Sequence, residues 1–309
     1  MALMKESSPP RWVRWVSRLV LVAPRFSPLR WLRWPLQWAA RKRGAWRWEV
    51  AGPAGDQIEA LVVPGASETE SSVTVLMTHG YLEIKELHLA RAWRLAEAGH
   101  TVILFDLPSH GASGGKGTSF GVREVDDLVA LVDAAVERKL VGSTVASLGY
   151  STGAAVALQH AAIDDRVAGV VAMAPFADLA TAAETFRQHL AEGLASAEAL
   201  REAMTEAAAR AGFDIEAASA VRASEQLDCP VLVIAGTEDR HLPPADHAVP
   251  IVEAAGGQLI EVEGANHLTL CTRPRPEVDE AILKFLADLP PADARPDESV
   301  VDPAAGESR

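Results

Sequence analysis

The stretch Gly149-Tyr150-Ser151-Thr152-Gly153 decides the fold, because it joins two apolar segments of different kinds. The five residues before it, Thr-Val-Ala-Ser-Leu, are typical of a buried strand, and the Ala-Ala-Val-Ala-Leu that follows favours a helix. A serine in such a strand-turn-helix has a strained backbone, and the flanking glycines let the strand and the helix approach closely. We therefore expect Ser151 to be held out as a nucleophile, with Gly149 and Gly153 supporting the turn.

Strands and helices alternate on both sides of this turn, which predicts a mainly parallel sheet covered by helices on both faces. A turn-rich connection joins the first two strands as a hairpin. The predicted strands are residues 46–50, 57–63, 73–78, 101–105, 144–150, 167–173, 231–235 and 259–262, and the predicted helices are 87–98, 120–140, 152–162, 245–255 and 278–286.

A serine nucleophile needs a histidine to take its proton and a carboxylate to orient that histidine. Asp239 follows the strand 231–235, and His267 follows the strand 259–262. Both therefore lie at the same edge of the sheet as Ser151, which predicts a Ser-Asp-His triad in that chain order. Glu238 and Asp178 are the alternative acids.

The intermediate of acyl transfer also needs two fixed N–H donors aimed at its oxyanion. Thr152 begins the helix after the serine, where backbone N–H groups are free and the helix dipole favours negative charge. The strand 73–78 ends in His79-Gly80-Tyr81. We expect the backbone N–H groups of Thr152 and Tyr81 to form the oxyanion hole, and His79 and His110 to have structural roles.

The chain resembles the α/β-hydrolase superfamily, particularly its bacterial esterase, lipase and aminopeptidase-like members. The resemblance covers residues 73–289 and rests on His79-Gly80, the Asp-Leu-Pro-Ser-His-Gly-Ala-Ser of 106–113, the serine turn, 236–239 and Asn266-His267. Many relatives have glycine where Ser109 stands. The resemblance implies an α/β-hydrolase fold with an eight-stranded sheet and a lid after the sixth strand, and it carries Ser151, Asp239 and His267 over as the triad.

These residues predict a serine hydrolase that cleaves a carboxylic ester or a related acyl compound through an acyl-enzyme. The same triad also serves acyltransferases, thioesterases and peptidases. A different class of function stays open: a membrane-associated binding protein that keeps the hydrolase fold without its activity. No phosphate-binding glycine loop or metal-ligand spacing occurs, so we expect neither a cofactor nor a metal. The acyl substrate and the oligomeric state are not specified by the sequence.

Two segments depart from the alternation of strands and helices. Residues 176–227 are rich in Ala and Glu and contain no proline, which predicts two or three helices forming a lid, or else an ornament beside the sheet. Residues 290–309 are polar, acidic and proline-containing, which predicts a disordered tail. The hydrolase domain is accordingly expected at 46–289.

The first 45 residues form a basic, tryptophan-rich arm. Residues 1–50 hold eleven Lys or Arg against two Glu, a net charge of +9 that leaves −22 for the remainder, and seven of the eight tryptophans. A helix over 11–23 would place Trp12, Trp15 and Leu19 on one face. This pattern suits an anionic membrane surface, although packing on the catalytic domain or on a second copy is the alternative. The acidic remainder argues against nucleic acid.

The arm has no apolar run long enough to span a bilayer, and it makes a poor secretory signal. The chain has two cysteines, Cys229 and Cys271, far apart in sequence, which favours free thiols and a reducing compartment. We expect a cytoplasmic protein, peripheral to the inner face of the membrane if the arm binds lipid.

Overall fold

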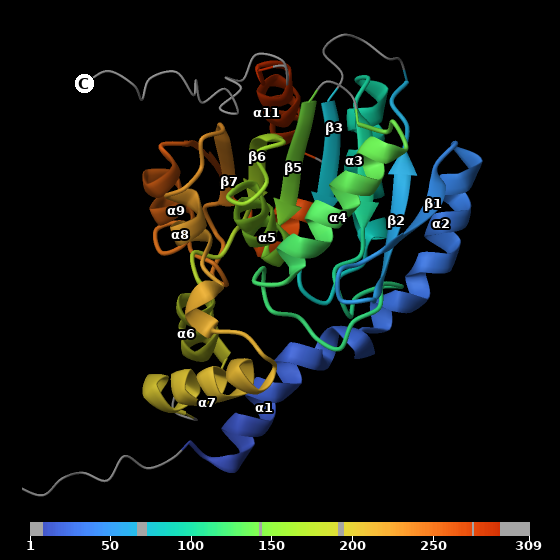
Figure 1. Ribbon diagram of the computed structural model, residues 1–309. Coiled ribbons are helices and arrows are strands. Elements are labelled where there is room, and N and C mark those ends of the chain that lie inside the picture. Colours follow the sequence, from blue (N-terminus) through green and yellow to red (C-terminus); the bar gives the residue numbers. More distant parts are fainter. Residues whose placement is uncertain (1–8, 67–72, 142–143, 191–194, 274, 291–309) are drawn as a thin grey trace, which may run out of the picture.

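The computed structural model describes residues 9–66, 73–141, 144–190, 195–273 and 275–290. Its centre is one eight-stranded sheet (Figure 1). The strands are β1 (Trp46–Ala51), β2 (Gln57–Val63), β3 (Val73–Thr78), β4 (Thr101–Phe105), β5 (Thr144–Tyr150), β6 (Val167–Met173), β7 (Val231–Gly236) and β8 (Gln258–Val262). Their spatial order is β1-β2-β4-β3-β5-β6-β7-β8, and β2 runs in the opposite direction to all the other strands. The predicted mostly parallel sheet is confirmed.

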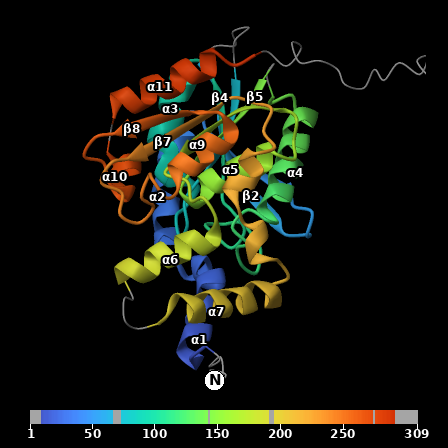
Figure 2. The same ribbon diagram turned by 90° about the vertical axis from the view of Figure 1, so that its left-hand side faces the viewer.

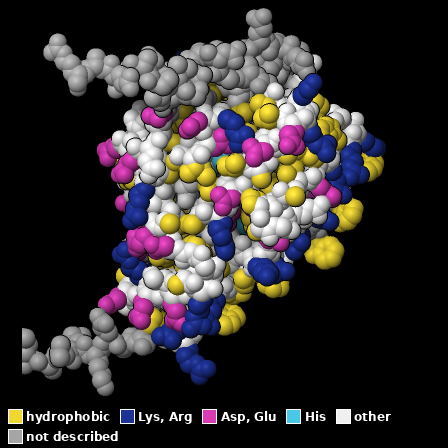
Figure 3. All heavy atoms as spheres, in the orientation of Figure 1, with side chains coloured by type: hydrophobic (Ala, Val, Ile, Leu, Met, Phe, Trp, Pro, Cys, Tyr) yellow, Lys and Arg dark blue, Asp and Glu magenta, His cyan; other side chains and the backbone are white. Residues whose placement is uncertain are grey.

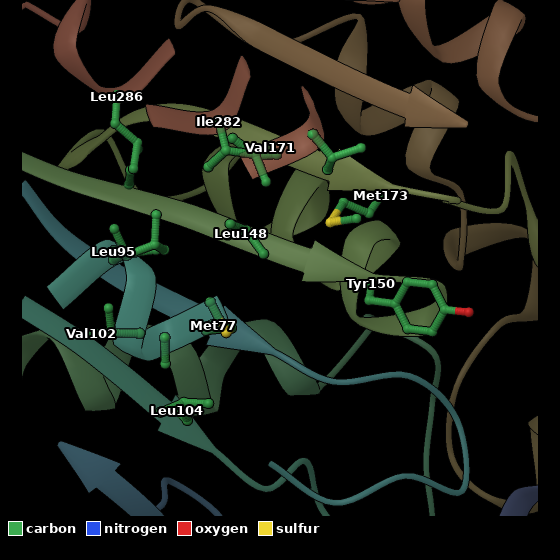
Figure 4. Packing of buried hydrophobic residues seen from close by; sticks show 14 of the residues in the cluster. Met77, Leu95, Val102, Leu104, Leu148, Tyr150, Val171, Met173, Ile282 and Leu286 are labelled. Carbon is green, nitrogen blue, oxygen red and sulfur yellow. The ribbon is translucent and has the colours of Figure 1, made fainter. Parts of the chain in front are cut away.

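Helices cover both faces of this sheet, so every residue of β3, β5, β6 and β7 is buried. The cluster on one face packs Leu148 and Met173 of the sheet against Leu95 and Ile282 of the helices (Figure 4). The helices on this face are α2 (Arg33–Lys42), α3 (Leu89–Glu97) and α11 (Pro276–Ala287), and those on the opposite face include α4 (Glu124–Glu137), α5 (Thr152–Ala161) and α9 (Ala248–Ala255).

The helix predicted over 120–140 is shorter at both ends, because Phe120 and Lys139 have positive φ angles of 56°. The carboxylate of Glu124, the first residue of α4, accepts the backbone N–H groups of Ser119 and Gly121, at 2.7 and 2.9 Å, and so holds the turn that precedes the helix. Two further helices were not predicted from the sequence: α2 and the short α10 (His267–Thr272). In α2 the buried side is marked by a polar residue, Gln37, which donates to Glu59 and Glu86.

The segment expected to be helical, 176–227, contains α6 (Leu179–Leu190), α7 (Ala197–Arg210), the 3₁₀ turn η4 (Ile215–Ala217) and α8 (Ala220–Ser224). Within its described residues the sole β pairing is an isolated bridge between Asp178 and Ser219. Helices α6 and α7 lie beyond the carboxyl ends of the parallel strands and project from the sheet domain, whereas α8 lies beside α9 (Figures 1 and 2).

The N-terminal arm consists of α1 (Arg11–Val22), two 3₁₀ turns over 23–26 and 28–32, and α2. It crosses the end of the molecule from which α6 and α7 project (Figure 1). Both views place α1 beside α7 (Figures 1 and 2). Among the helices that the structure describes, none has the length and apolar character needed to cross a bilayer. The expected acidic tail lies outside the described residues, except for Pro290.

Candidate active site

Ser151 lies in a strained turn between β5 and α5. Its φ is 53° and its ψ is −117°, a conformation that non-glycine residues rarely adopt. A Cβ atom on Gly149 would lie 2.1 Å from the carbonyl oxygen of Gly153, and one on Gly153 would lie 2.4 Å from that of Thr78. The two glycines therefore allow the close contact of strand and helix that exposes the serine.

The structure brings the three residues of the predicted triad together. The Ser151 hydroxyl donates to Nε2 of His267 at 3.0 Å, and Nδ1–H of His267 donates to Oδ2 of Asp239 at 2.7 Å. His267 is the first residue of α10, which is held by a capping box between Asn266 and Thr269. Asp239 follows β7, so the three groups come from the segments that follow β5, β7 and β8 at the carboxyl edge of the sheet.

The carboxylate of Asp239 is fixed from both sides and is almost completely buried. Its other oxygen, Oδ1, accepts the backbone N–H groups of His241 and Leu242, each at 2.9 Å. The alternative acids are placed elsewhere: Glu238 is exposed, and Asp178 accepts from the backbone and hydroxyl of Thr181 at the start of α6. Among the three candidates, Asp239 is thus the one that bonds to the histidine.

Tyr150, whose role the sequence left open, supports the histidine. Its hydroxyl donates a hydrogen bond to the backbone carbonyl of His267, and the centres of the two rings are 5.3 Å apart. Figure 4 shows the ring at the end of β5, with the hydroxyl directed away from the aliphatic cluster. Burial raises the pKa of this hydroxyl, so it stays a donor. The side chain therefore ties β5 to the start of α10.

The two expected oxyanion donors follow two neighbouring strands of the sheet, β5 and β3. Thr152 is the first residue of α5, and Tyr81 follows β3 in the loop over 79–83. Within the described residues, neither backbone N–H donates a hydrogen bond. The loop is braced by Glu83, which accepts from the N–H of Gly80 at 2.8 Å, and by the Tyr81 hydroxyl, which donates to the carbonyl of Val20 in α1 at 2.6 Å.

His79 and His110 hold the loops beneath this donor. His79 accepts the N–H of Leu107 at 3.1 Å and donates to the carbonyl of Gly80 at 2.8 Å. His110 accepts the N–H of Leu82 at 3.3 Å and donates to Pro108 at 2.9 Å. Burial lowers the pKa of His79, and burial together with His79 lowers that of His110 to about 3. Both rings are therefore neutral structural groups.

A group of three side chains, which the sequence did not reveal, links the loop over 79–83 to α10. His88 donates to Glu83 at 2.9 Å, and its Nδ1 is 3.6 Å from the sulfur of Cys271, one turn after His267. Burial lowers the pKa of the His88 ring, but Cys271 and Glu83 outweigh this effect and raise the pKa to about 10. The residue types alone gave no signal, because Cys271 lies 183 residues from His88 in sequence. Neither Cys229 nor Cys271 forms a disulfide. The described residues contain no group of three His, Cys, Asp or Glu that could hold a metal ion.

The sequence profile of the Alpha/beta hydrolase family matches residues 75–281 of this chain. The chain is 25% identical over 224 residues to the uncharacterized protein YqkD of Bacillus subtilis (strain 168), an overlap of 70% of this chain and 72% of that one.

Two of the similar solved structures come from Pyrococcus furiosus and Butyrivibrio proteoclasticus. Esterase Pf2001 of Pyrococcus furiosus superposes with a TM-score of 0.63 at 20% identity, covering 80% of this chain and 93% of that one. Est1E of Butyrivibrio proteoclasticus, with ferulic acid bound, gives 0.61 at 19% identity, covering 78% and 98%. At such identities the likeness establishes the fold.

Proposed function

Because the chain belongs to the alpha/beta hydrolase family, we propose that it is a serine hydrolase that cleaves a carboxylic ester or a related acyl compound. The observation that carries this proposal is the chain of two hydrogen bonds from Ser151 through His267 to Asp239, at 3.0 and 2.7 Å. A strained serine, a base and a buried acid in this order are what acyl transfer through an acyl-enzyme requires.

In the proposed reaction, Oγ of Ser151 attacks the acyl carbon while its proton passes to Nε2 of His267. The carbonyl oxygen of the substrate becomes an oxyanion that accepts from the free N–H groups of Tyr81 and Thr152. His267 then gives its proton to the departing alcohol, which leaves the acyl group on Ser151. Water attacks this ester with His267 again as the base, and the acid and free serine are formed. Asp239 keeps Nδ1 protonated throughout.

Exposed apolar side chains near the proposed site favour a substrate with an apolar acyl group. Leu82 follows Tyr81 in sequence, Leu268 follows His267, and Phe186 of α6 contacts His241. Phe186 stacks on His241 at 5.5 Å, and His241 lies edge-on to His267 at 5.9 Å. This contact supports the proposal that 176–227 acts as a lid, since α6 reaches the catalytic histidine's neighbour.

An ester substrate is favoured over the other acyl compounds by the esterases among the similar structures. A puromycin-hydrolyzing peptidase of Mycobacterium tuberculosis is also similar, with a TM-score of 0.58 at 21% identity, covering 81% of this chain and 40% of that one, so amides belong in the test. The non-catalytic alternative is disfavoured because the strain at Ser151 has no use in a binding protein.

The proposal is tested by labelling the full chain with a fluorophosphonate probe, which reacts with activated serines. We expect labelling of the wild type, none of Ser151→Ala, and wild-type labelling of Ser196→Ala, a control at an exposed helix cap. Hydrolysis of p-nitrophenyl esters should fall roughly 10⁴-fold or more in Ser151→Ala. Equal labelling of the wild type and Ser151→Ala would refute a serine nucleophile. A series of acyl-chain lengths, with matched thioesters and amides, then identifies the substrate class.

A further inference from the structure

The segment over residues 11–42, here called the strap, exposes most of the large hydrophobic side chains at the surface. It holds nine of the fifteen that are exposed among the described residues. Trp31 is 81% and Trp15 64% exposed. Figure 3 shows hydrophobic and basic side chains alternating along the lower right edge, where Figure 1 places the strap. The nine are Trp12, Trp15, Val16, Leu19, Phe26, Trp31, Leu32, Trp34 and Trp38.

The tryptophans are exposed although the strap itself is firmly attached. The face of α1 that carries Val13, Ser17 and Leu21 is buried. Arg14 and Arg18 form ion pairs with Glu206 of α7, at 3.2 and 3.4 Å. The helix thus packs on the protein, but through the face opposite its tryptophans. The apolar face is left for a partner outside the chain.

Basic groups surround the exposed indoles. Within the described part of the chain, Arg11, Arg25, Arg30, Arg33 and Arg41 form no ion pair. The strap also contains a groove of about 540 Å³ whose walls are three arginines and two tryptophans of α1. The arginines of such a surface favour contact with anionic groups, and its indoles favour the headgroup region of a bilayer.

We propose that the strap docks the protein on the surface of an anionic lipid bilayer, with the indoles at the level of the headgroups and the arginines on lipid phosphates. A second copy meeting this face would oppose two surfaces of the same positive charge. A fluid bilayer also accommodates side chains that protrude singly, whereas a protein partner would need a matching pocket for each.

The strap contacts the loop that carries a proposed oxyanion donor. Tyr81 donates through its hydroxyl to Val20, and Ser27 donates to the carbonyl of Leu82 at 2.7 Å. The backbone N–H of Thr118 also donates to Leu21 at 2.9 Å. The arrows of β3 and β5 point toward the edge that the strap crosses (Figure 1). A bilayer bound to the strap would therefore lie on the side of the molecule that holds the triad.

The test is co-sedimentation of the full chain with vesicles of phosphatidylcholine and phosphatidylglycerol in equal amounts, at low salt. We expect the wild type to sediment. Binding should fall at least tenfold in Trp15→Ala/Trp31→Ala/Trp34→Ala, which removes indoles, and in Arg11→Gln/Arg25→Gln/Arg33→Gln, which removes positive charges. Raised salt and pure phosphatidylcholine should weaken the binding of the wild type.

A control variant, Val136→Ala/Ile163→Ala, removes exposed apolar side chains away from the strap and should bind as the wild type does. Since docking does not rest on the proposed hydrolysis, Ser151→Ala should also sediment normally. Circular dichroism verifies that each variant is folded. A wild type that stays in the supernatant at low salt would overturn the proposal. The proposal would also be overturned if the tryptophan variant sedimented like the wild type. Two further results would count against it: binding of the protein to single-stranded DNA in place of vesicles, and a wild-type dimer that dissociates in the tryptophan variant.

Discussion

At the scale of single residues, Tyr150 has the most specific supporting role, because it bonds to the backbone of the proposed base. Tyr150→Phe removes one hydrogen bond and keeps the ring in the core. The carbonyl of His267 would then lose this donor, at a stability cost of about 1 kcal/mol. We expect kcat for a p-nitrophenyl ester to fall about tenfold with little change in KM, because substrate contacts are unchanged while His267 is held less firmly. A wild-type kcat would show that the tyrosine only packs.

A second prediction at this scale concerns the acid Asp127 in α4. Burial, together with Glu124, Asp126 and Asp56, raises the pKa of Asp127 to about 7. The folded protein therefore keeps a proton that the unfolded chain releases near pH 4, so this group's contribution to stability is present below that pH and is lost as the pH rises through about 7.

Asp127→Asn cannot ionise, so its stability relative to the wild type should depend on pH. We expect no gain at pH 4 and a gain of about 2 kcal/mol at pH 8, a figure reduced for the partial exposure of the side chain. Urea unfolding at the two pH values measures it. Glu137→Gln, at the exposed end of the same helix, is the control and should give equal effects at both. A gain for Asp127→Asn that does not change with pH would contradict the assigned cause.

At the scale of elements, helix α6 connects the proposed lid to the site through the aromatic contact between Phe186 and His241. Phe186 is 45% exposed, so its truncation should leave the fold intact. Phe186→Ala removes apolar area beside His241, and we expect KM for long-chain esters to rise about tenfold while acetate esters are hydrolysed as before. Gln188→Ala, exposed on the same helix, is the matched control. Equal effects on short and long esters would argue against an acyl-binding role.

At the scale of the whole molecule, the alternation of strands and helices was sufficient to predict the sheet and to place Ser151, Asp239 and His267 at one edge of it. Asp239 follows a strand that is apolar throughout, and His267 follows a strand that is apolar except for Gln258 and Glu261, so their shared edge was readable from order alone. Tyr150 and the group formed by Glu83, His88 and Cys271 were not readable in this way, because their roles depend on tertiary contacts between distant segments. Helix periodicity gave the apolar face of α1, but not which face packs.

The hydrogen bonds between the strap and the loop of Tyr81 and Leu82 predict that the strap and the proposed site are coupled. Val13 is 1% exposed in the contact of α1 with the body, whereas Val16, on the same helix, is 38% exposed. Val13→Asp would bury an unpaired carboxylate at a cost of several kcal/mol, which α1 avoids by detaching. Val16→Asp places its charge in water and is the matched control.

Detachment should have two measurable results in the absence of lipid. Trypsin should cleave Val13→Asp within the arginine-rich strap much faster than it cleaves the wild type or Val16→Asp. The loop of Tyr81 and Leu82 loses its anchors on the strap, so ester hydrolysis should fall about tenfold or more, mainly in kcat. Rapid cleavage with full activity would show that the loop is positioned by Glu83 and the two buried histidines without help from the strap.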